Sequence, residues 1–252
     1  MSDLSRRKLI TTGIATVAGV SGLAAARSLA KHHGLIPPDA GGFYGLGETL
    51  DYAAQRILTR HSMAREFPPS EISNPPFANP VDPLGEEFKR LQAGAFADWR
   101  LTVEGMVARA ASFSLAEIRS FPSRSQITHL SCEEGWSYIA QWTGVPLSHV
   151  LGVVGTLPQA RYVVYRSIQS DWWDSIDMAD AFHPQTLVAY GMNGAELPVG
   201  NGGPLRLRVP RQLGYKNVKY ITSLTVTDDL KRFGKGLGSV SPEGGYAWYA
   251  GI

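Results

Sequence analysis

A single cysteine, Cys132, constrains the fold of this 252-residue chain more than any other residue, because one thiol cannot form a disulfide within the chain. The fold must therefore be held by a hydrophobic core, and 44% hydrophobic residues supply enough apolar surface for one. Side-chain alternation from Gln126 to Leu130 predicts a short strand, which Cys132 follows closely, and Gly135 lets the backbone turn. We expect Cys132 to be held rigidly at the end of a strand, where it can face a cleft.

Two interpretations of Cys132 are open at this point. Free cysteine is among the most buried residue types, so an inert thiol in the core is the simpler interpretation. The other interpretation is a thiol occupied by a ligand. The neighbouring Glu133 and Glu134 could tune such a ligand, although an exposed acidic pair is more ordinary. The net charge of +2 gives no support to a nucleic-acid partner, and we expect none.

The N-terminal segment carries a targeting pattern. Adjacent Arg6 and Arg7 precede an apolar stretch that runs to about Ala26 and is rich in Gly, Thr and Ala. This pattern predicts a twin-arginine export signal over residues 1–26. A membrane anchor is the alternative, but the stretch is too polar and barely long enough for a good one. We therefore expect a periplasmic protein that the twin-arginine export machinery carries already folded, with cleavage of the signal left open.

Short helices and short strands follow one another without regular β–α alternation, which predicts an α+β fold with mixed sheets and short helices. Six prolines between Phe67 and Pro83 predict an extended connection. We expect residues 27–83 to form an N-terminal helix and a Pro-rich segment that pack on a catalytic domain spanning 84–252. The expected helices cover 48–58, 86–91, 114–121 and 146–154, and the third begins with the capping-box spacing of Ser114 and Glu117. The expected strands cover 99–105, 126–130, 162–165, 187–190, 205–209 and 218–226, with a tight hairpin turn at 193–194. In the first helix one side gathers the apolar residues Leu50, Ala53, Ala54, Ile57 and Leu58.

A basic stretch follows a Gly-rich turn at residues 201–204. On the strand expected there, Leu205, Leu207 and Val209 would face the core while the two intervening arginines share the other face. Arginine binds phosphate with bidentate geometry, so the stretch predicts a pocket for a phosphate-bearing ligand. The cations that would form it are Arg206, Arg208, Arg211, Lys216 and Lys219. A solvated strand face with scattered basic residues is the alternative.

Several spaced motifs together resemble the molybdopterin-dependent oxidoreductases of the sulfite oxidase family, in particular its exported single-domain bacterial members. The resemblance covers 99–252 well and 48–83 loosely. The motifs that carry it lie at 128–144, 183–186, 193–198, 201–206 and 214–219. It implies a sulfite-oxidase-type molybdopterin-binding fold and a molybdenum–molybdopterin cofactor in its mononucleotide form.

The same resemblance assigns roles to individual residues. Cys132 falls on the position whose thiolate binds molybdenum directly, and a soft thiolate suits such a metal. The implied pterin contacts are Ser167, Asn201, Arg206, Asn217, Val218 and Lys219, with the basic residues meeting the cofactor phosphate. His61, Arg65 and Glu66 are implied as further contacts, although the local pattern there departs from the family's.

The implied reaction is two-electron oxygen-atom transfer on a small sulfur-type substrate, either sulfite oxidation or sulfoxide reduction. Sulfite would need an arginine-lined pocket, for which Arg60, Arg65 and Arg166 are candidates. A single cysteine leaves no haem-attachment motif or iron–sulfur cluster, so we expect a separate membrane haem protein, cytochrome or quinone-linked electron carrier. An exported cofactor-free ligand-binding protein that retains the fold is the alternative.

Three other groups have a functional and an ordinary interpretation. Trp172 and Trp173, which we expect in a loop, could line a substrate funnel, shield a partner surface or pack in the core. Asp171 and Asp174 beside them could face a substrate, a suggestion that rests on position alone. His183 precedes a proline, and we expect it to hold a turn.

Overall fold

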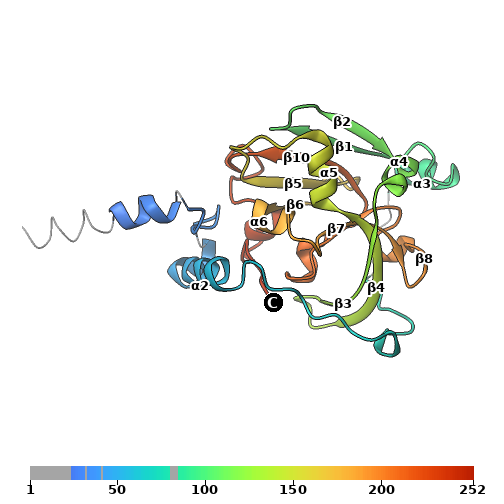
Figure 1. Cartoon of the computed structure of the whole chain (residues 1–252), viewed down its shortest axis with the longest axis horizontal. Coiled ribbons are helices and arrows are strands. Elements are labelled where there is room, and N and C mark those ends of the chain that lie inside the picture. The colour runs from blue at the N-terminus through green and yellow to red at the C-terminus, as the bar shows by residue number, and fades with distance from the viewer. Residues whose placement is uncertain (1–23, 32, 41, 80–84) are drawn as a thin grey trace, which may run out of the picture.

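Two β-sheets, one mixed and one antiparallel, form the body of the molecule in the computed structural model, which describes residues 24–31, 33–40, 42–79 and 85–252 (Figure 1). Short helices and 3-10 turns connect the strands and pack around the sheets. After the helical residues 24–31, the helices are α2 (Gly45–Leu58), α3 (Glu86–Ala93), α4 (Leu115–Ser120), α5 (Leu147–Val154), α6 (Met178–Ala181) and α7 (Val240–Glu243). The 3-10 turns are η1 (Gly42–Tyr44), η2 (Pro69–Glu71), η3 (Val199–Asn201) and η4 (Gly214–Lys216). This arrangement confirms the predicted α+β class.

The first sheet has the strand order β2-β1-β10-β5-β6. Its strands are β1 (Arg100–Gly105), β2 (Ala111–Ser114), β5 (Tyr162–Ser167), β6 (Trp173–Asp177) and β10 (Ile221–Thr227). β1 runs parallel to β10, and the other neighbours are antiparallel. α4 follows β2 and begins with the predicted capping box, in which Ser114 and Glu117 bond each other's backbone N–H.

The second sheet has the order β3-β4-β7-β8, with β9 paired to β7. Its strands are β3 (Arg124–Ser131), β4 (Ser137–Pro146), β7 (Leu187–Met192), β8 (Ala195–Glu196) and β9 (Arg206–Arg208). β3 and β4 form the hairpin that carries Cys132 at its tip. The register of β4 against β7 shifts at Gly144, where a Cβ atom would collide with the backbone of Val188. Only glycine fits this crossing.

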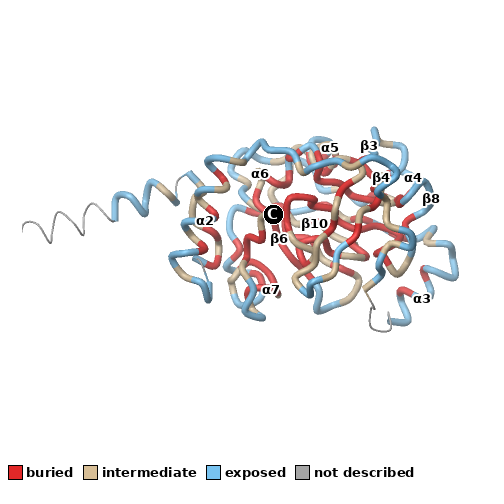
Figure 2. Tube along the Cα trace, turned by 90° about the horizontal axis from the view of Figure 1, so that it is seen from below, coloured by how far each residue is buried: buried red, intermediate tan, exposed pale blue. Residues whose placement is uncertain are grey.

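The largest hydrophobic cluster takes side chains from both sheets and from α5. Leu205, Leu207 and Val209 belong to it, as the alternation along β9 predicts. Figure 2 shows the buried segments concentrated in the sheets, while the N-terminal part of the chain and the outer loops are more exposed.

The expected strand 218–226 is wrong at its beginning. Leu207 donates its N–H to Val218, and Lys219 pairs with Arg206, so this part of the chain extends the second sheet. Tyr220 then takes a positive φ of 57°, and β10 begins in the first sheet at Ile221. The chain therefore changes sheets at a residue whose type does not predict a left-handed backbone.

Two further expectations need correction. Trp173 does not lie in a loop: it begins β6 and is buried against Phe233. The predicted first helix exists as α2, but its apolar side is exposed, because the residues that it buries are Glu48, Tyr52 and Arg56. The predicted export signal lies almost entirely outside the described residues, since description begins at residue 24. Within the described part of the chain, no helix has the length and apolar character needed to cross a bilayer.

Candidate functional site

A cavity of about 240 Å³ opens where the β3–β4 hairpin meets the loops before β10. It brings Cys132 together with four of the predicted cofactor contacts, Asn201, Arg206, Asn217 and Lys219. Its full lining is Phe77, Asn79, Leu130, Cys132, Glu133, Glu134, Trp136, Tyr138, Gln169, Trp172, Asn201, Arg206, Gly214, Tyr215, Asn217 and Lys219.

Cys132 begins the turn that joins β3 to β4. Its N–H donates to the carbonyl of Trp136 at 2.9 Å, and its carbonyl accepts from Gly135 at 3.1 Å. Gly135 takes a φ of +90°, which favours glycine there. On the opposite wall the backbone of Gly214 lies so close that a Cβ would sit 3.3 Å from the Cys132 sulfur. Both glycines let the chain surround this thiol tightly.

The thiol is protonated in the cofactor-free protein. Burial, with a smaller contribution from the neighbouring Glu133 and Glu134 carboxylates, raises the pKa of Cys132 to about 12. The S–H donates to Glu133 Oε2 at 3.1 Å and lies 3.7 Å from Glu134 Oε2. A metal ligand must be a thiolate, so binding a cation here has to displace the proton.

Two cations, Arg206 and Lys219, line this cavity, and Arg208 donates to the lining residue Asn217 without lining the cavity itself. None of the three has a carboxylate partner among the described residues. Arg206 donates to the carbonyls of Asn201 and Asn217, each at 2.7 Å, and its Nε has no partner. Burial lowers the pKa of Arg208 to about 9 and that of Lys219 to about 8. Charges buried this way are costly until an anion pairs with them.

Asn217 lines the cavity and also forms hydrogen bonds that hold the surrounding loop. Its side-chain oxygen accepts from Arg208 at 2.8 Å and from the Val209 N–H at 2.7 Å, while its amide nitrogen donates to Leu213 at 2.9 Å. Asn217 therefore braces the loop between β9 and β10, and its role as a cofactor contact stays a prediction.

Five predicted contacts do not line the cavity: His61, Arg65, Glu66, Ser167 and Val218. His61 is exposed, Arg65 lies over the ring of Phe67 at 4.6 Å, and Glu66 pairs with Arg124 at 2.8 Å. Val218 is buried in the main core. Ser167 accepts from the N–H of Gln169, which does line the cavity, so it positions that loop. Their cofactor-binding roles stay predictions without support from the cavity.

The expectation of a five-cation pocket needs correction. Lys216 is fully buried and paired with Asp174 at 2.5 Å, so neither residue faces the cavity or a substrate. Arg211 donates to the carbonyls of Thr59 and Arg60 and holds the chain after α2. The alternative of a solvated strand face is wrong too, because Arg206 and Arg208 are 3% and 0% exposed.

An aromatic wall completes the cavity. Phe77 packs on Trp136, which stacks on Tyr138, and Trp172 reaches the lining from the loop before β6. The possible funnel position of Trp172 is thus supported. Phe77 and Asn79 lie in no motif, and Tyr138 lies in the 128–144 motif without an assigned role. His183 holds a turn as expected, with the Gln185 N–H donating to its Nδ1.

The described residues fit a molybdopterin in two respects. The thiol supplies a soft metal ligand, and the unpaired Arg206 Nε with its neighbouring cations supplies a cradle for a phosphate. Among these residues no group of three His, Cys, Asp or Glu is placed to hold a metal. The soft thiolate of Cys132 suits a metal whose other ligands arrive with the cofactor.

Comparison with known proteins agrees with this geometry. The oxidoreductase molybdopterin-binding domain matches residues 90–232. YedZ1 of Azospira oryzae, provisionally named a protein-methionine-sulfoxide reductase subunit, is 37% identical over 196 residues, which cover 77% of this chain and 70% of that protein. The protein-methionine-sulfoxide reductase catalytic subunit MsrP of Xanthomonas axonopodis is 35% identical over 147 residues, 52% of this chain and 46% of that one.

A solved structure supports the fold. The sulfane dehydrogenase SoxCD from Paracoccus pantotrophus aligns with a TM-score of 0.51 at 20% identity, over 68% of this chain and 46% of that one. The chain thus spans about half the length of MsrP and of this structural neighbour. The predicted family resemblance is confirmed: the chain belongs to the molybdopterin-binding oxidoreductases of the sulfite oxidase family.

Proposed function

We propose that this oxidoreductase reduces a neutral sulfoxide by oxygen-atom transfer at a molybdenum centre held by Cys132. One observation carries the proposal: the carboxylates of Glu133 and Glu134 share the cavity with the thiol. An acidic pair beside the metal ligand discriminates between the two reactions that the family resemblance implies, because sulfite is an anion and a sulfoxide is neutral.

The cofactor would be held by the basic side of the cavity. Arg206 and Lys219 would pair with its phosphate, which offsets the cost of burying them. The metal would take the Cys132 thiolate in place of its proton. When bound, the cofactor supplies a two-electron redox centre that accepts the substrate oxygen. A cavity of about 240 Å³ is small, which supports the mononucleotide form without a second nucleotide.

The charge of the cavity disfavours sulfite. An anion about 4 Å from one carboxylate is repelled by about 4 kcal/mol at an effective dielectric constant near 20. Arg206 and Lys219 cannot compensate if the phosphate occupies them. The arginines suggested for a sulfite pocket, Arg60, Arg65 and Arg166, do not line the cavity. Arg166 lies over the rings of Trp173 and Phe233, at 5.3 and 5.9 Å.

The aromatic wall suits a thioether-like substrate. Phe77, Trp136 and Trp172 offer apolar faces to alkyl groups beside the polar sulfur. The names of YedZ1 and MsrP, which refer to methionine sulfoxide, support the same substrate class. In the balanced reaction, two electrons and two protons convert the sulfoxide to a thioether and one water. The electrons would come singly from a separate haem or quinone-linked carrier in the membrane.

Export belongs to the proposal as well. The Arg6–Arg7 pair and the weakly apolar stretch after it support a periplasmic location reached through the twin-arginine route. A cofactor inserted before export is the physical reason for choosing a route that carries folded proteins. The alternative of a cofactor-free binding protein has less support, because it provides no anion for the buried Arg206 and Arg208 and the half-buried Lys219.

Steady-state kinetics with both substrates tests the proposal. We expect turnover of methionine sulfoxide with reduced viologen as the electron donor, and far slower oxidation of sulfite with an oxidised carrier. The double variant Glu133→Gln, Glu134→Gln should improve kcat/KM for sulfite at least tenfold, since it removes two repulsive charges. The matched pair Glu86→Gln, Glu87→Gln on the exposed face of α3 should change neither. Preference of the unaltered enzyme for sulfite would overturn the substrate assignment.

A further inference from the structure

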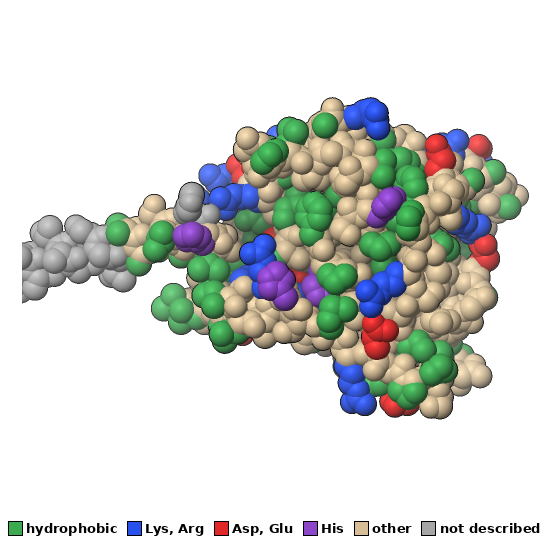
Figure 3. All heavy atoms as spheres, viewed as in Figure 1, with side chains coloured by type: hydrophobic (Ala, Val, Ile, Leu, Met, Phe, Trp, Pro, Cys, Tyr) green, Lys and Arg blue, Asp and Glu red, His purple; other side chains and the backbone are tan. Residues whose placement is uncertain are grey.

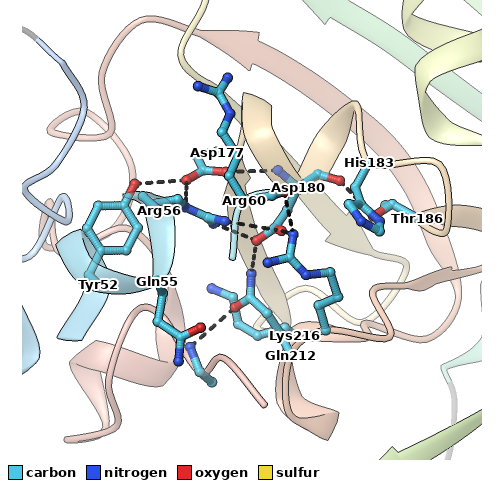
Figure 4. A network of polar contacts seen from close by, with 12 residues as sticks. Tyr52, Gln55, Arg56, Arg60, Asp177, Asp180, His183, Thr186, Gln212 and Lys216 are labelled. Carbon is cyan, nitrogen blue, oxygen red and sulfur yellow. Dashed lines mark hydrogen bonds and ion pairs between the residues drawn. The ribbon is translucent and has the colours of Figure 1, made fainter. Parts of the chain in front are cut away.

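α2 is attached to the body by its polar side (Figure 4). Arg56 forms ion pairs with Asp177 at 2.7 Å and Asp180 at 2.6 Å, and Tyr52 donates its hydroxyl proton to Asp177 at 2.8 Å. Glu48 accepts the N–H of Trp248 at 3.0 Å. These three residues of α2 lie at i, i+4 and i+8, so they share one face. Ion pairs and hydrogen bonds therefore attach α2 to the body, whereas an ordinary surface helix is attached by the packing of an apolar stripe.

The opposite face of α2 presents its apolar residues to solvent. Leu46, Leu50, Ile57 and Leu58 are 72%, 61%, 65% and 77% exposed. In η1, immediately before the helix, Phe43 is 87% exposed. Figure 3 shows hydrophobic side chains gathered over the α2 end of the molecule, with basic side chains beside them. A contiguous apolar face of this kind marks an interaction site.

The charges around this face indicate what covers it. In the described residues between 24 and 66, the exposed charged side chains are the cations Arg27, Lys31, Arg60 and Arg65 and the carboxylates Asp51 and Glu66. Glu66 is already paired with Arg124, which leaves an excess of positive charge. An apolar helix face flanked by cations has the composition of helices that lie in the interface of anionic membranes. Fourteen residues extend only about 21 Å, so α2 is too short to span a bilayer.

The sequence before α2 also favours contact with a membrane. The apolar stretch that ends near Ala26 is itself drawn to membranes, whether it acts as a signal or as an anchor, and it lies about twenty residues before α2. A second copy of the chain fits less well. A two-fold interface on this face would bring one set of cations against an identical set.

We propose that η1 and α2 lie flat on an anionic lipid bilayer, with Phe43, Leu46, Leu50 and Ile57 inserted at the boundary between headgroups and acyl chains. The polar network of Arg56 holds the helix to the body and leaves the apolar face available to lipid. This surface is independent of the molybdenum chemistry, and it would keep the enzyme close to a membrane-bound electron carrier.

A fluorescent reporter at single positions tests insertion in the full chain. Leu50 is replaced by an environment-sensitive fluorescent amino acid, and a control protein carries the same group at Val153, a 36% exposed residue of α5. With vesicles of phosphatidylglycerol and phosphatidylcholine, emission from position 50 should shift to the blue, and emission from position 153 should not. Raising the salt should reduce the shift.

Each other outcome overturns the proposal. An unchanged emission at position 50 in protein that floats with the vesicles would mean that the stretch before residue 27 binds alone. A blue shift without vesicles that grows with protein concentration would indicate a second copy. A blue emission independent of both would indicate that the chain covers the face itself.

Charge reversal provides a second measurement. The variant Lys31→Glu, Arg60→Glu should bind the vesicles with an apparent affinity at least tenfold lower, measured by the emission shift at position 50. Each lost cation weakens binding about fivefold. A matched reversal of two exposed cations far along the chain, Lys89→Glu and Arg90→Glu on α3, should leave the affinity unchanged. Equal losses in both variants would indicate a general charge effect and overturn the assignment of this face.

Discussion

Replacing Lys219 by methionine tests whether the cavity is built to receive an anion. The Lys219 ammonium donates to the carbonyls of Asn79 at 3.1 Å and Gly200 at 2.7 Å, and no carboxylate pairs with it among the described residues. Burial, together with the nearby Arg206, lowers its pKa from 10.5 to about 8. The cofactor-free protein therefore contains a charge that the fold disfavours.

The size of this penalty follows from the pKa. A folded value near 8 against 10.5 in the unfolded chain costs about 3 kcal/mol at pH 7. Methionine has a similar length, and its introduction forfeits two hydrogen bonds worth about 1 kcal/mol each. The cofactor-free Lys219→Met variant should therefore be more stable by about 1 kcal/mol at pH 7. Because the folded pKa is lowered, the penalty is present below about pH 8 and fades as the pH rises towards 10.5. The loss of the two hydrogen bonds remains, so the advantage of the variant should disappear and then reverse as the pH approaches 10.5.

Lys216→Met is the matched control. Lys216 lies three residues earlier and is buried against Asp174 at 2.5 Å, so removing it leaves an unpaired buried carboxylate. The expected loss is about 3–5 kcal/mol. Urea unfolding at pH 7 of proteins from a host that cannot make molybdopterin measures both changes. The reasoning is refuted if Lys219→Met is destabilised by 1 kcal/mol or more. In a cofactor-producing host, the same variant should retain less cofactor than the unaltered protein.

Three further predictions follow from buried contacts. Burial raises the pKa of Glu48 to about 7, so the folded state holds the proton more tightly and stability falls as the pH rises from about 4.5 to 7. Glu48→Gln should therefore raise the free energy of unfolding by at most about 3 kcal/mol at pH 8 and by little at pH 4, measured by urea unfolding. Arg56→Met removes the ion pairs to Asp177 and Asp180 and leaves Asp177 without a cationic partner among the described residues, so α2 should lose its protection from hydrogen exchange, with about 3–5 kcal/mol of stability lost. Gly144→Ala forces a Cβ against the backbone of Val188 and should lower Tm by about 5 °C in a thermal scan, whereas Gly152→Ala on α5, with open space around it, should not.

The local patterns predicted elements well where neighbouring residues alone decide the structure. The capping box at Ser114, the hairpin turn at Asn193–Gly194 and the strand before Cys132 all formed as their residues indicate. The sheet change at Tyr220 could not be predicted, because a left-handed backbone at a tyrosine is imposed by pairing with two different sheets.

The sequence predicted the residues on the two sides of the cavity, but not which of the neighbouring cations face it. The motifs placed Cys132, Arg206 and Lys219 in one cavity, but sequence spacing cannot distinguish a cation facing a cavity from one paired in the core. Lys216 and Lys219 show this, since Asp174 reaches only the first. The same limit applies to α2, where an apolar stripe normally predicts the buried face and here marks the exposed one.

Sulfur coordination at the metal tests the central claim most directly. X-ray absorption at the molybdenum edge counts the sulfur ligands of the holoenzyme, and a dithiolene pterin supplies two of them. If Cys132 binds the metal, the unaltered protein should show about three sulfur neighbours per molybdenum and Cys132→Ser about two. An equal sulfur count in the two proteins, with molybdenum present in both, would contradict the assignment of Cys132 as the metal ligand.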